Sequence, residues 1–319
     1  MSGTARLRLA VLGAGVMGTY HARVIAHSER GELARVVDPD EAAGRQLAER
    51  YDAEWLPEVD RLDDVHAVVI AAPTEAHCDL VKLALDSRVP VLVEKPVSAD
   101  LAVTEMLVSV AEQRQTPIMC GFVERFNPAM LTVLPLVAEP LHITAMRHSP
   151  YANRIRTGVA WDLLIHDVDA CLRLVNDDPQ AVRSARGVFH PSSDEGEDVA
   201  EAVMTFRSGA MASVSASRIG QRKVRSINIV ELNRGIEIDL LRRDVTIYRH
   251  VSAELPAYGA EGYRQQTIIE IPELVSSREP LAAQLTHFLN LVEGRVDMKE
   301  ERESILPSHR VVDRVMSTV

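Results

Sequence analysis

The stretch from Leu9 to Gly18 constrains the fold more than any other part of this 319-residue chain. It reads Leu-Ala-Val-Leu-Gly-Ala-Gly-Val-Met-Gly, which is an apolar run of strand length, a Gly-x-Gly-x-x-Gly turn and the start of a helical pattern. That order of strand, turn and helix is the context that a dinucleotide-binding turn requires. Gly13 would make the tight turn, Gly15 would let a pyrophosphate approach the backbone, and Gly18 would let the helix pack on the strand. The alternative is a glycine-rich turn that holds no ligand.

An acidic residue at a suitable distance strengthens the dinucleotide prediction. Asp38 lies twenty positions after Gly18, at the end of a second apolar strand, Leu33–Val37. A carboxylate there can accept hydrogen bonds from both ribose hydroxyls of an adenosine. It would repel the extra phosphate of NADP, and Pro39 offers that phosphate no side-chain donor, so we expect NAD. The alternative role for Asp38 is to cap a helix expected over residues 40–50.

Apolar strands alternate with helices through the first 122 residues. We expect further strands over about 65–72, 89–93 and 117–122, and helices over about 17–27, 75–87 and 100–113. Continuous apolar strands separated by helices predict a parallel sheet that is covered on both faces. Ligands of such sheets bind at the carboxyl ends of the strands, so we expect Gly13, Asp38, Thr74 and Lys95 to lie along one edge.

Lys95 stands between the end of a predicted strand and Pro96. The proline restricts Lys95 to an extended or turn conformation, and Glu94 is available as its partner. The ammonium group can therefore be aimed into a cofactor cleft with little freedom to move. The alternative is a solvated surface lysine that follows a buried strand.

The pattern changes after Phe122, where the strand–helix alternation stops. We place a first domain over residues 1–122 and a second over residues 123–319. In the second domain we expect strands over about 141–147, 199–206, 210–219, 226–231, 235–240 and 245–249, and helices over about 128–137, 161–175, 280–293 and 308–317. The late strands follow one another with hairpin spacing and predict an antiparallel sheet with one face available for substrate or subunit contact.

The helix expected over 161–175 carries a possible acid–base pair. Asp162 and His166 are four positions apart and would share one helix face. A carboxylate at that spacing can orient an imidazole and set its basicity, which suits a general base near neutral pH. The alternative is an ion pair on the helix surface. We expect Asp167 and Asp169 to point elsewhere and to be solvated or structural.

Composition excludes several classes of protein. With 46% hydrophobic and 25% charged residues the chain is globular, and its net charge of -11 disfavours binding to nucleic acid or anionic membranes. Its three cysteines have no C-x-x-C spacing, so we expect buried reduced thiols and no metal. The first apolar run is too short for a signal or membrane segment, so we expect a cytoplasmic protein. We expect His21 to be a packing or solvent-facing residue and the acidic stretch 192–198 to be an exposed loop.

The motifs Glu94-Lys95-Pro96 and Asp162-x-x-x-His166-Asp167, in one chain behind the glycine turn, resemble those of the glucose-fructose oxidoreductase and inositol dehydrogenase (Gfo/Idh/MocA) family. The likeness includes Ala72-Pro73-Thr74 with His77 three positions on, and the stretch 121–128. The resemblance implies an N-terminal Rossmann domain with a parallel sheet. It implies a C-terminal α+β domain built on an open, mainly antiparallel sheet, through which such chains form homodimers or homotetramers.

The resemblance also implies a chemistry. The lysine matching Lys95 binds the reacting hydroxyl and the nicotinamide region, the histidine matching His166 takes the hydroxyl proton, and the aspartate matching Asp162 assists by hydrogen bonding. An ammonium from the first domain and an imidazole from the second would converge beside one nicotinamide ring, without a metal. The residues expected to bind the cofactor are Gly13, Gly15, Val16, Met17, Gly18, Asp38, Ala72, Pro73, Thr74, His77, Glu94 and Lys95.

The substrate side departs from the family pattern. Many members have glycines where this chain has Val159-Ala160-Trp161 and Leu164, which leaves the shape of that side of the pocket open. The segment 158–162 and the stretch 222–225 look more like those of nucleotide-sugar 3-dehydrogenases than of free-inositol enzymes. The residues expected to bind substrate are Lys95, Arg125, Tyr151, Asn153, Arg154, Asp162 and His166. The cluster of Tyr151, Asn153, Arg154 and Arg156 could meet a phosphate, or it could be a surface loop or form salt bridges between subunits.

These features predict an NAD-dependent oxidoreductase acting on a ring hydroxyl or ketone of a sugar or nucleotide sugar. A cyclitol or aminocyclitol dehydrogenase is the alternative within that class. A non-catalytic sensor of dinucleotide and sugar is the alternative of another class, and an imine or double-bond reductase with the same fold is a third.

Overall fold

The computed structural model describes residues 6–59, 61–151, 157–191, 196–255 and 262–317. The chain divides into two compact units, which are described one at a time. The first unit is Met1–Phe126 with Arg278–Asp313, and the second is Asn127–Ser277 with Arg314–Val319. Residues 278–313 thus group with the first unit, a return of the chain that the predicted domain division at residue 122 did not include.

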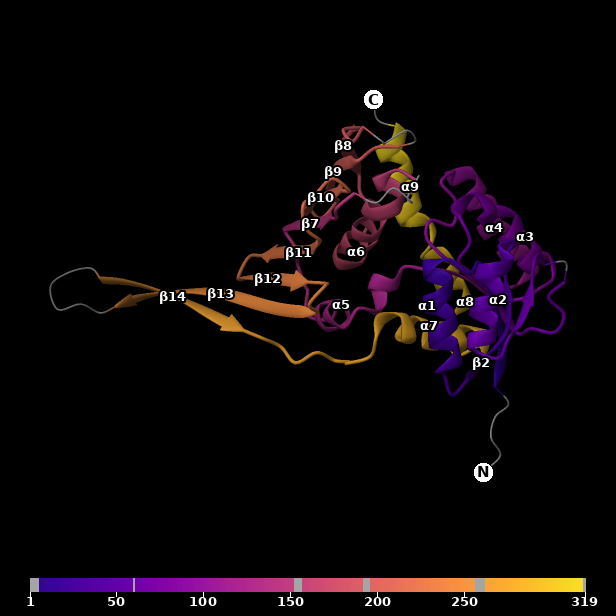
Figure 1. Cartoon of the computed structure of the whole chain (residues 1–319). Helices are drawn as coiled ribbons and strands as arrows, with labels where there is room; N and C mark the ends of the chain where they lie inside the picture. The colour runs from indigo at the N-terminus through magenta and orange to yellow at the C-terminus, as the bar shows by residue number, and fades with distance from the viewer. Residues whose placement is uncertain (1–5, 60, 152–156, 192–195, 256–261, 318–319) are drawn as a thin grey trace. The chain divides into compact units, whose positions relative to one another are not determined.

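The first unit is built on a six-stranded parallel sheet (Figure 1). Its strands are β1 (Leu7–Leu12), β2 (Gly31–Val37), β3 (Glu54–Leu56), β4 (Ala67–Ile70), β5 (Val91–Val93) and β6 (Ile118–Cys120). Their order, β3-β2-β1-β4-β5-β6, is that of doubly wound dinucleotide-binding sheets. The predicted Rossmann sheet is therefore confirmed. The short strand β3 was not predicted.

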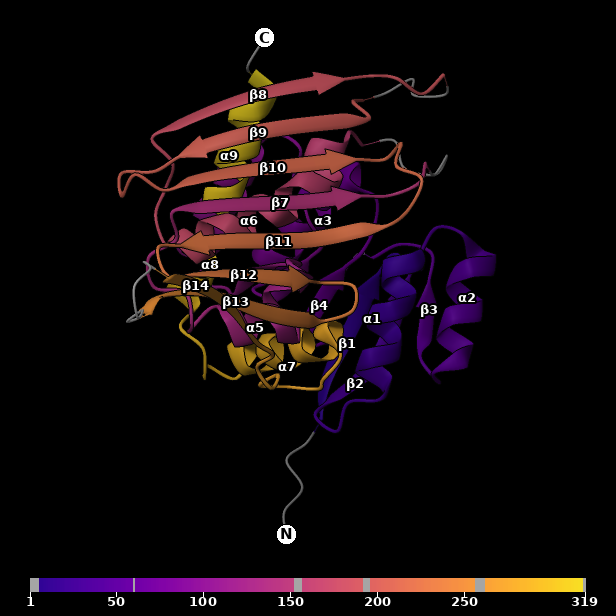
Figure 2. The same ribbon diagram turned by 90° about the vertical axis from the view of Figure 1, so that its left-hand side faces the viewer.

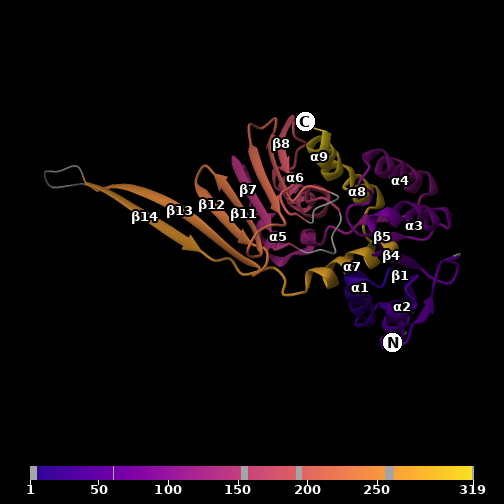
Figure 3. The same ribbon diagram turned by 45° about the horizontal axis from the view of Figure 1, so that its top comes forward.

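Helices cover both faces of this sheet. They are α1 (Val16–Ala26), α2 (Glu41–Arg50), α3 (Thr74–Asp86), α4 (Leu101–Arg114), the 3-10 helix η1 (Val123–Phe126), α7 (Pro280–Val292) and α8 (Met298–Glu303). Figure 3 shows α1 and α2 on one side of the sheet, with α3 and α4 on the other. The apolar face of α7, with Leu285, Phe288 and Leu289, packs into the same core as Leu9 and Val11 of β1. This burial of apolar surface explains why residues 278–313 group with the first unit.

The second unit is built on an eight-stranded sheet (Figure 2). Its strands are β7 (His142–His148), β8 (Ala181–Gly187), β9 (Val199–Thr205), β10 (Met211–Ser217), β11 (Val224–Glu231), β12 (Arg234–Asp239), β13 (Asp244–Leu255) and β14 (Gly262–Glu270). The order is β14-β13-β12-β11-β7-β10-β9-β8, and all neighbours are antiparallel except β7 and β10. The predicted open, mainly antiparallel sheet is confirmed, with β8 and β14 as additions.

Two helical segments follow one another on this sheet. They are η2 (Ala160–Leu164) and α6 (Ile165–Val175), while the short helix α5 (Pro128–Val133) precedes β7 and the last helix α9 (Leu306–Ser317) ends near β8. The helix α6 packs on β7 and β10. Strand β7 alternates accordingly, with Ile143, Ala145 and Arg147 buried and the residues between them more exposed.

A buried ion pair joins α6 to the sheet. The guanidinium of Arg147 donates from Nε to Oδ2 of Asp167 over 3.0 Å and from Nη2 to Oδ1 over 2.9 Å. Arg147 is 2% exposed and Asp167 is 1% exposed. Asp167 is therefore structural, as one of the two predicted possibilities had it, and it is not solvated.

We expect Arg147→Met to lower the free energy of unfolding by about 3–5 kcal/mol, because the substitution removes the bidentate partner of a buried carboxylate. Urea denaturation followed by circular dichroism measures the loss. The double variant Arg147→Met with Asp167→Leu removes both charges and should recover most of the stability. A double variant as unstable as the single one would contradict this account.

Candidate functional site

The glycine turn between β1 and α1 has the shape of a pyrophosphate cradle. Gly13 has a φ of +106°, and a Cβ added there would lie 2.7 Å from the backbone of Ala71. A Cβ on Gly18 would collide with the backbone oxygen of Gly13. At Gly15, by contrast, no atom lies within 4 Å of the place a Cβ would take. Two of the glycines are thus required by the fold, whereas the third borders open space.

The first turn of α1 offers backbone hydrogen-bond donors to a ligand that would occupy this open space. The first hydrogen bond within the helix runs from the N–H of Thr19 to the oxygen of Gly15, over 2.9 Å. The N–H groups of Val16, Met17 and Gly18 belong to the first turn, where helical geometry provides no acceptor. Donors of this kind and the positive end of the helix dipole favour a pyrophosphate, so the residues present fit a dinucleotide.

Asp38 is tied to the glycine turn. It directly follows β2, and its Oδ2 accepts a hydrogen bond from the N–H of Ala14 over 2.6 Å, while Oδ1 accepts from the N–H of Asp40 over 2.8 Å. Each carboxylate oxygen has a second lone pair, so the group can still accept from a ribose. The cap of α2 is Asp40, whose side chain accepts from Ala43. The alternative role of Asp38 as the cap of that helix is therefore wrong.

A buried histidine connects the loops that follow β4 and β5. His77, on α3 and 1% exposed, has Nε2 3.0 Å from the oxygen of Ala72 and Nδ1 2.9 Å from the oxygen of Pro96. Between Ala72 and His77, Pro73 is the N-cap residue of α3 and Thr74 is the first residue of that helix. The sequence predicted His77 at the cofactor, and the structure places its ring in the wall that joins these two loops.

Lys95 stands two positions after the end of β5, at the carboxyl edge of the sheet, and is partly exposed. The peptide bond between Lys95 and Pro96 is cis. On the far side of Pro96, the N–H of Val97 donates to Nε2 of His309 over 3.1 Å, and His309 is fully buried. The segment that carries Lys95 is thus held by two buried histidines, His77 and His309, of which His309 was not predicted.

Glu94, expected as a partner of Lys95, has a different contact in the first unit. Its Oε1 lies 2.7 Å from Nε2 of His21 on α1, and both residues are buried. A Cβ on Gly121 would come within 3.0 Å of Glu94. His21 is therefore a packing residue, one of the two predicted possibilities, and it fixes the carboxylate that precedes Lys95.

Arg125, predicted to bind substrate, makes contacts within the first unit. Its guanidinium donates from Nη1 to Oγ of Ser304 over 2.7 Å and from Nη2 to the oxygen of Ser304 over 2.9 Å. It also lies over the ring of Phe122, 4.6 Å from the centroid. These contacts hold the 3-10 helix η1 against the chain near α8 and favour a structural role for Arg125.

In the second unit, Asp162 and His166 lie at the junction of two kinds of helix. The segment η2 is a π-helix, in which the N–H of Ile165 donates to the oxygen of Ala160 five residues back, and the α-helix α6 begins at Ile165. The sequence predicted one α-helix over this region, because the spacing of its apolar residues does not distinguish a π-helix from an α-helix. Asp162 lies in the wider π turn and is partly exposed, while His166 lies in the first α turn and is 9% exposed. π turns occur frequently at functional sites.

The start of η2 is anchored by an acidic pair that was expected to be exposed. Glu197 is 6% exposed and accepts the N–H of Ala160 at Oε1 over 2.7 Å. Asp198 is fully buried and pairs with Nε of Arg218 over 2.8 Å. The prediction of an exposed loop is wrong for these two residues, because backbone N–H groups and a guanidinium satisfy their carboxylates.

Of the remaining predicted site residues, one lies within the described part of the chain and three lie outside it. Tyr151, partly exposed after β7, stacks on His190 with a distance of 3.6 Å between ring centroids. Asn153, Arg154 and Arg156 lie outside the described residues. The convergence of Lys95 and His166 on one nicotinamide stays a prediction.

The three cysteines are thiols outside any disulfide, and two of the three are buried. Cys120 and Cys171 are buried as expected, whereas Cys78 is only partly buried. Burial raises the pKa of the Cys171 thiol, so that residue stays a protonated packing group.

The described part of the chain holds no group of three or more His, Cys, Asp or Glu side chains arranged to bind a metal. Within the described ranges every helix is too short or too polar to cross a lipid bilayer.

Comparison with known proteins identifies two family matches. Residues 7–122 match the model of an oxidoreductase family with an NAD-binding Rossmann fold, and residues 139–231 match the GFO/IDH/MocA C-terminal domain. The UDP-N-acetylglucosamine 3-dehydrogenase of Acidithiobacillus ferrooxidans is 29% identical over 289 residues, which is 90% of this chain and 88% of that protein. An inositol 2-dehydrogenase of Mycolicibacterium smegmatis is 30% identical over 75% of each chain. A solved structure of the Acidithiobacillus enzyme superimposes with a TM-score of 0.82 at 28% identity, covering 99% of this chain and 97% of that one.

We expect Gly15→Ser to weaken NAD binding at least about tenfold, or about 1.4 kcal/mol, because the hydroxymethyl group enters the space that fits the pyrophosphate. Without NAD its thermal unfolding midpoint should stay close to that of the unmodified protein, since serine is a favoured residue at a helix start and meets no neighbour there.

The matched control is Gly18→Ser, whose side chain meets the backbone of Gly13. This variant should unfold at a lower temperature even without NAD. Fluorescence titration and differential scanning calorimetry measure the two effects, and NAD affinity unchanged in Gly15→Ser would rule out the cradle.

Proposed function

The chain belongs to the Gfo/Idh/MocA oxidoreductase family, with its NAD-binding Rossmann fold, and on that premise we propose that it is a dehydrogenase of a nucleotide-linked sugar. One observation carries the choice of substrate. The similarity to the UDP-N-acetylglucosamine 3-dehydrogenase extends over 90% of this chain and through both units. The inositol dehydrogenase from Mycolicibacterium matches over 75%. A ring hydroxyl of the sugar would be oxidised, or the matching ketone reduced.

The first unit would hold NAD with the features found at the carboxyl edge of its sheet. The N–H groups at the start of α1 would bind the pyrophosphate, and Asp38 would accept hydrogen bonds from the adenosine ribose. The loops that begin at Ala72 and Glu94 would border the nicotinamide half. When bound, NAD supplies the hydride acceptor for the oxidation of an alcohol.

We assign three catalytic roles. The Lys95 ammonium would bind the reacting hydroxyl and stabilise the negative charge that develops on its oxygen. His166 would accept the hydroxyl proton, and Asp162 would assist that histidine by hydrogen bonding. In the direction of ketone reduction, His166 would return the proton to the oxygen.

The proposal extends to assembly and location. The exposed face of the eight-stranded sheet carries the apolar side chains Met146, Val203, Met211, Val230 and Tyr248, each between 37% and 46% exposed. An apolar face of this kind favours association, so we propose a homodimer or homotetramer built through it. Buried thiols outside disulfides are compatible with a reducing compartment, and we propose the cytoplasm.

We expect His166→Asn and Lys95→Met each to lower kcat by about 10²- to 10⁴-fold, the range typical of lost acid–base or electrostatic help. The His166→Asn variant should keep its affinity for NAD. The control is His27→Asn, which changes an exposed histidine at the end of α1 and should leave kcat unchanged.

The assay compares NADH formation from UDP-N-acetylglucosamine, free N-acetylglucosamine and myo-inositol, scored by absorbance. A higher kcat/KM on the nucleotide-linked sugar is the expected result. Preference for inositol would favour the cyclitol alternative. NAD binding without turnover of any sugar or polyol would favour the sensor.

We expect Met211→Asp to shift the protein from an oligomer to a monomer, because a charge on the apolar face opposes its burial. Size-exclusion chromatography with light scattering measures the mass. The control is Met106→Asp, which makes the same substitution at a methionine of α4 in the first unit that is 39% exposed, and which should leave the mass unchanged. An unchanged mass for Met211→Asp would exclude this face as the interface.

A further inference from the structure

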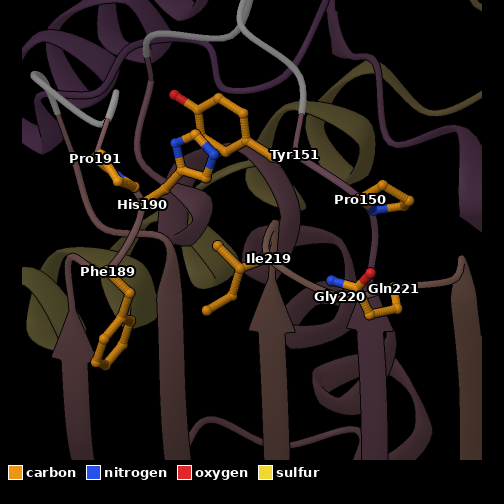
Figure 4. A pocket seen from close by; sticks show the side chains of 8 residues that line it. All are labelled: Pro150, Tyr151, Phe189, His190, Pro191, Ile219, Gly220 and Gln221. Carbon is orange, nitrogen blue, oxygen red and sulfur yellow. The ribbon is translucent and has the colours of Figure 1, made fainter.

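A pocket in the second unit lies where three strands of the sheet end (Figure 4). The strands β7, β8 and β10 run in the same direction, because β9 is antiparallel to both β8 and β10 while β7 and β10 are parallel. Their carboxyl ends therefore share one edge. The segments that leave them line the pocket with Pro150, Tyr151, Phe189, His190, Pro191, Ile219, Gly220 and Gln221.

Two stacked rings form one wall of this pocket. The rings of Tyr151 and His190 lie 3.6 Å apart between centroids with 7° between their planes, and Figure 4 shows them overlapping. Both side chains are partly exposed, and Phe189 beside them is 66% exposed. Flat π surfaces next to apolar side chains such as Ile219 bind planar aromatic groups by stacking.

The wall is fixed by a buried ion pair beneath it. The Oδ2 atom of Asp198 accepts the N–H of Phe189 over 2.6 Å and that of His190 over 2.7 Å, while Oδ1 accepts Nε of Arg218 over 2.8 Å. The guanidinium of Arg218 also lies 5.8 Å from the centroid of Tyr151. Because Asp198 and Arg218 are almost fully buried, the backbone beneath the stack is set before any ligand arrives.

The same pair supports the helix that carries Asp162. Arg218 donates from Nη1 to the oxygen of Thr157 over 3.1 Å and from Nη2 to the oxygen of Gly196 over 3.2 Å. Thr157 leads into η2, whose first N–H groups donate to Glu197. The pocket and the start of η2 therefore share one support within the second unit.

We propose that the Tyr151–His190 stack is the subsite for the base of a nucleoside diphosphate sugar. This inference rests on the proposed function and names the part of the substrate that the pocket binds. The exposed residues Arg222 and Lys223 directly follow Gln221 at the pocket and bring positive charge next to it, in a chain whose net charge is -11. A diphosphate that follows the base would be attracted to that charge.

The test is binding of UDP to the NAD-loaded protein, measured by isothermal titration calorimetry. His190→Ala and Tyr151→Ala should raise the Kd for UDP by about 10- to 100-fold, the range that one lost base–aromatic stack produces. His190→Phe and Tyr151→Phe keep a ring at each position and should stay within about threefold of the unmodified protein, since stacking needs only a π face. A circular dichroism spectrum and a thermal unfolding midpoint check that each variant folds.

Kinetics separate failure of the subsite from failure of the proposed function. With an active enzyme, the alanine variants should raise KM for UDP-N-acetylglucosamine by a larger factor than they raise KM for free N-acetylglucosamine. Turnover of the nucleotide sugar together with unchanged UDP affinity in both alanine variants would overturn the subsite alone. Ring-dependent UDP binding without turnover of any nucleotide sugar would leave the subsite and overturn the dehydrogenase activity. If none of UDP, dTDP, ADP and GDP binds the NAD-loaded protein, the subsite is excluded.

Discussion

The close approach of α1 to the turn after β1 is the constraint on which the first unit depends. The helix can lie against the strand only if positions 13 and 18 carry no side chain, because a Cβ at either position would meet backbone atoms. The same approach directs the first N–H groups of α1 toward the open space beside Gly15. The carboxylate of Asp38 then closes the turn by accepting the N–H of Ala14. One steric requirement thus creates both the packing of the sheet and the anion site at its edge.

Apolar runs and glycine spacing were sufficient to predict the parallel sheet from sequence, because central strands such as β1 and β4 are buried on both faces and contain almost only apolar residues. The strand β3 has three residues, too few to show a period, and β8 contains arginines and a serine that weaken its alternation. The helix α7 was predicted as a helix but not as part of the first unit. Its amphipathic pattern shows that one face is buried without showing what covers it.

The chemical groups of the candidate site could be predicted from the sequence. The contacts that hold those groups in place could not. Motif spacing pointed to Asp38, Lys95 and His166, whereas the contacts that hold these segments join residues far apart in the chain. His309 accepts a backbone N–H from Val97, more than two hundred positions earlier. In the sequence Asp198 belongs to an acidic stretch, and only the tertiary fold shows that it forms a buried ion pair with Arg218. No local pattern contains such pairings, because each depends on the tertiary fold.

The π turn at the start of α6 has a consequence for how this region can change. A π turn takes one more residue than an α turn, so the rotation of α6 about its own axis depends on the number of residues between Ala160 and Ile165. Deleting one residue there would turn the π turn into an α turn, which would change the direction of Asp162 relative to His166. In this segment the number of residues therefore determines the relative direction of the two side chains, in addition to the residue types that supply them.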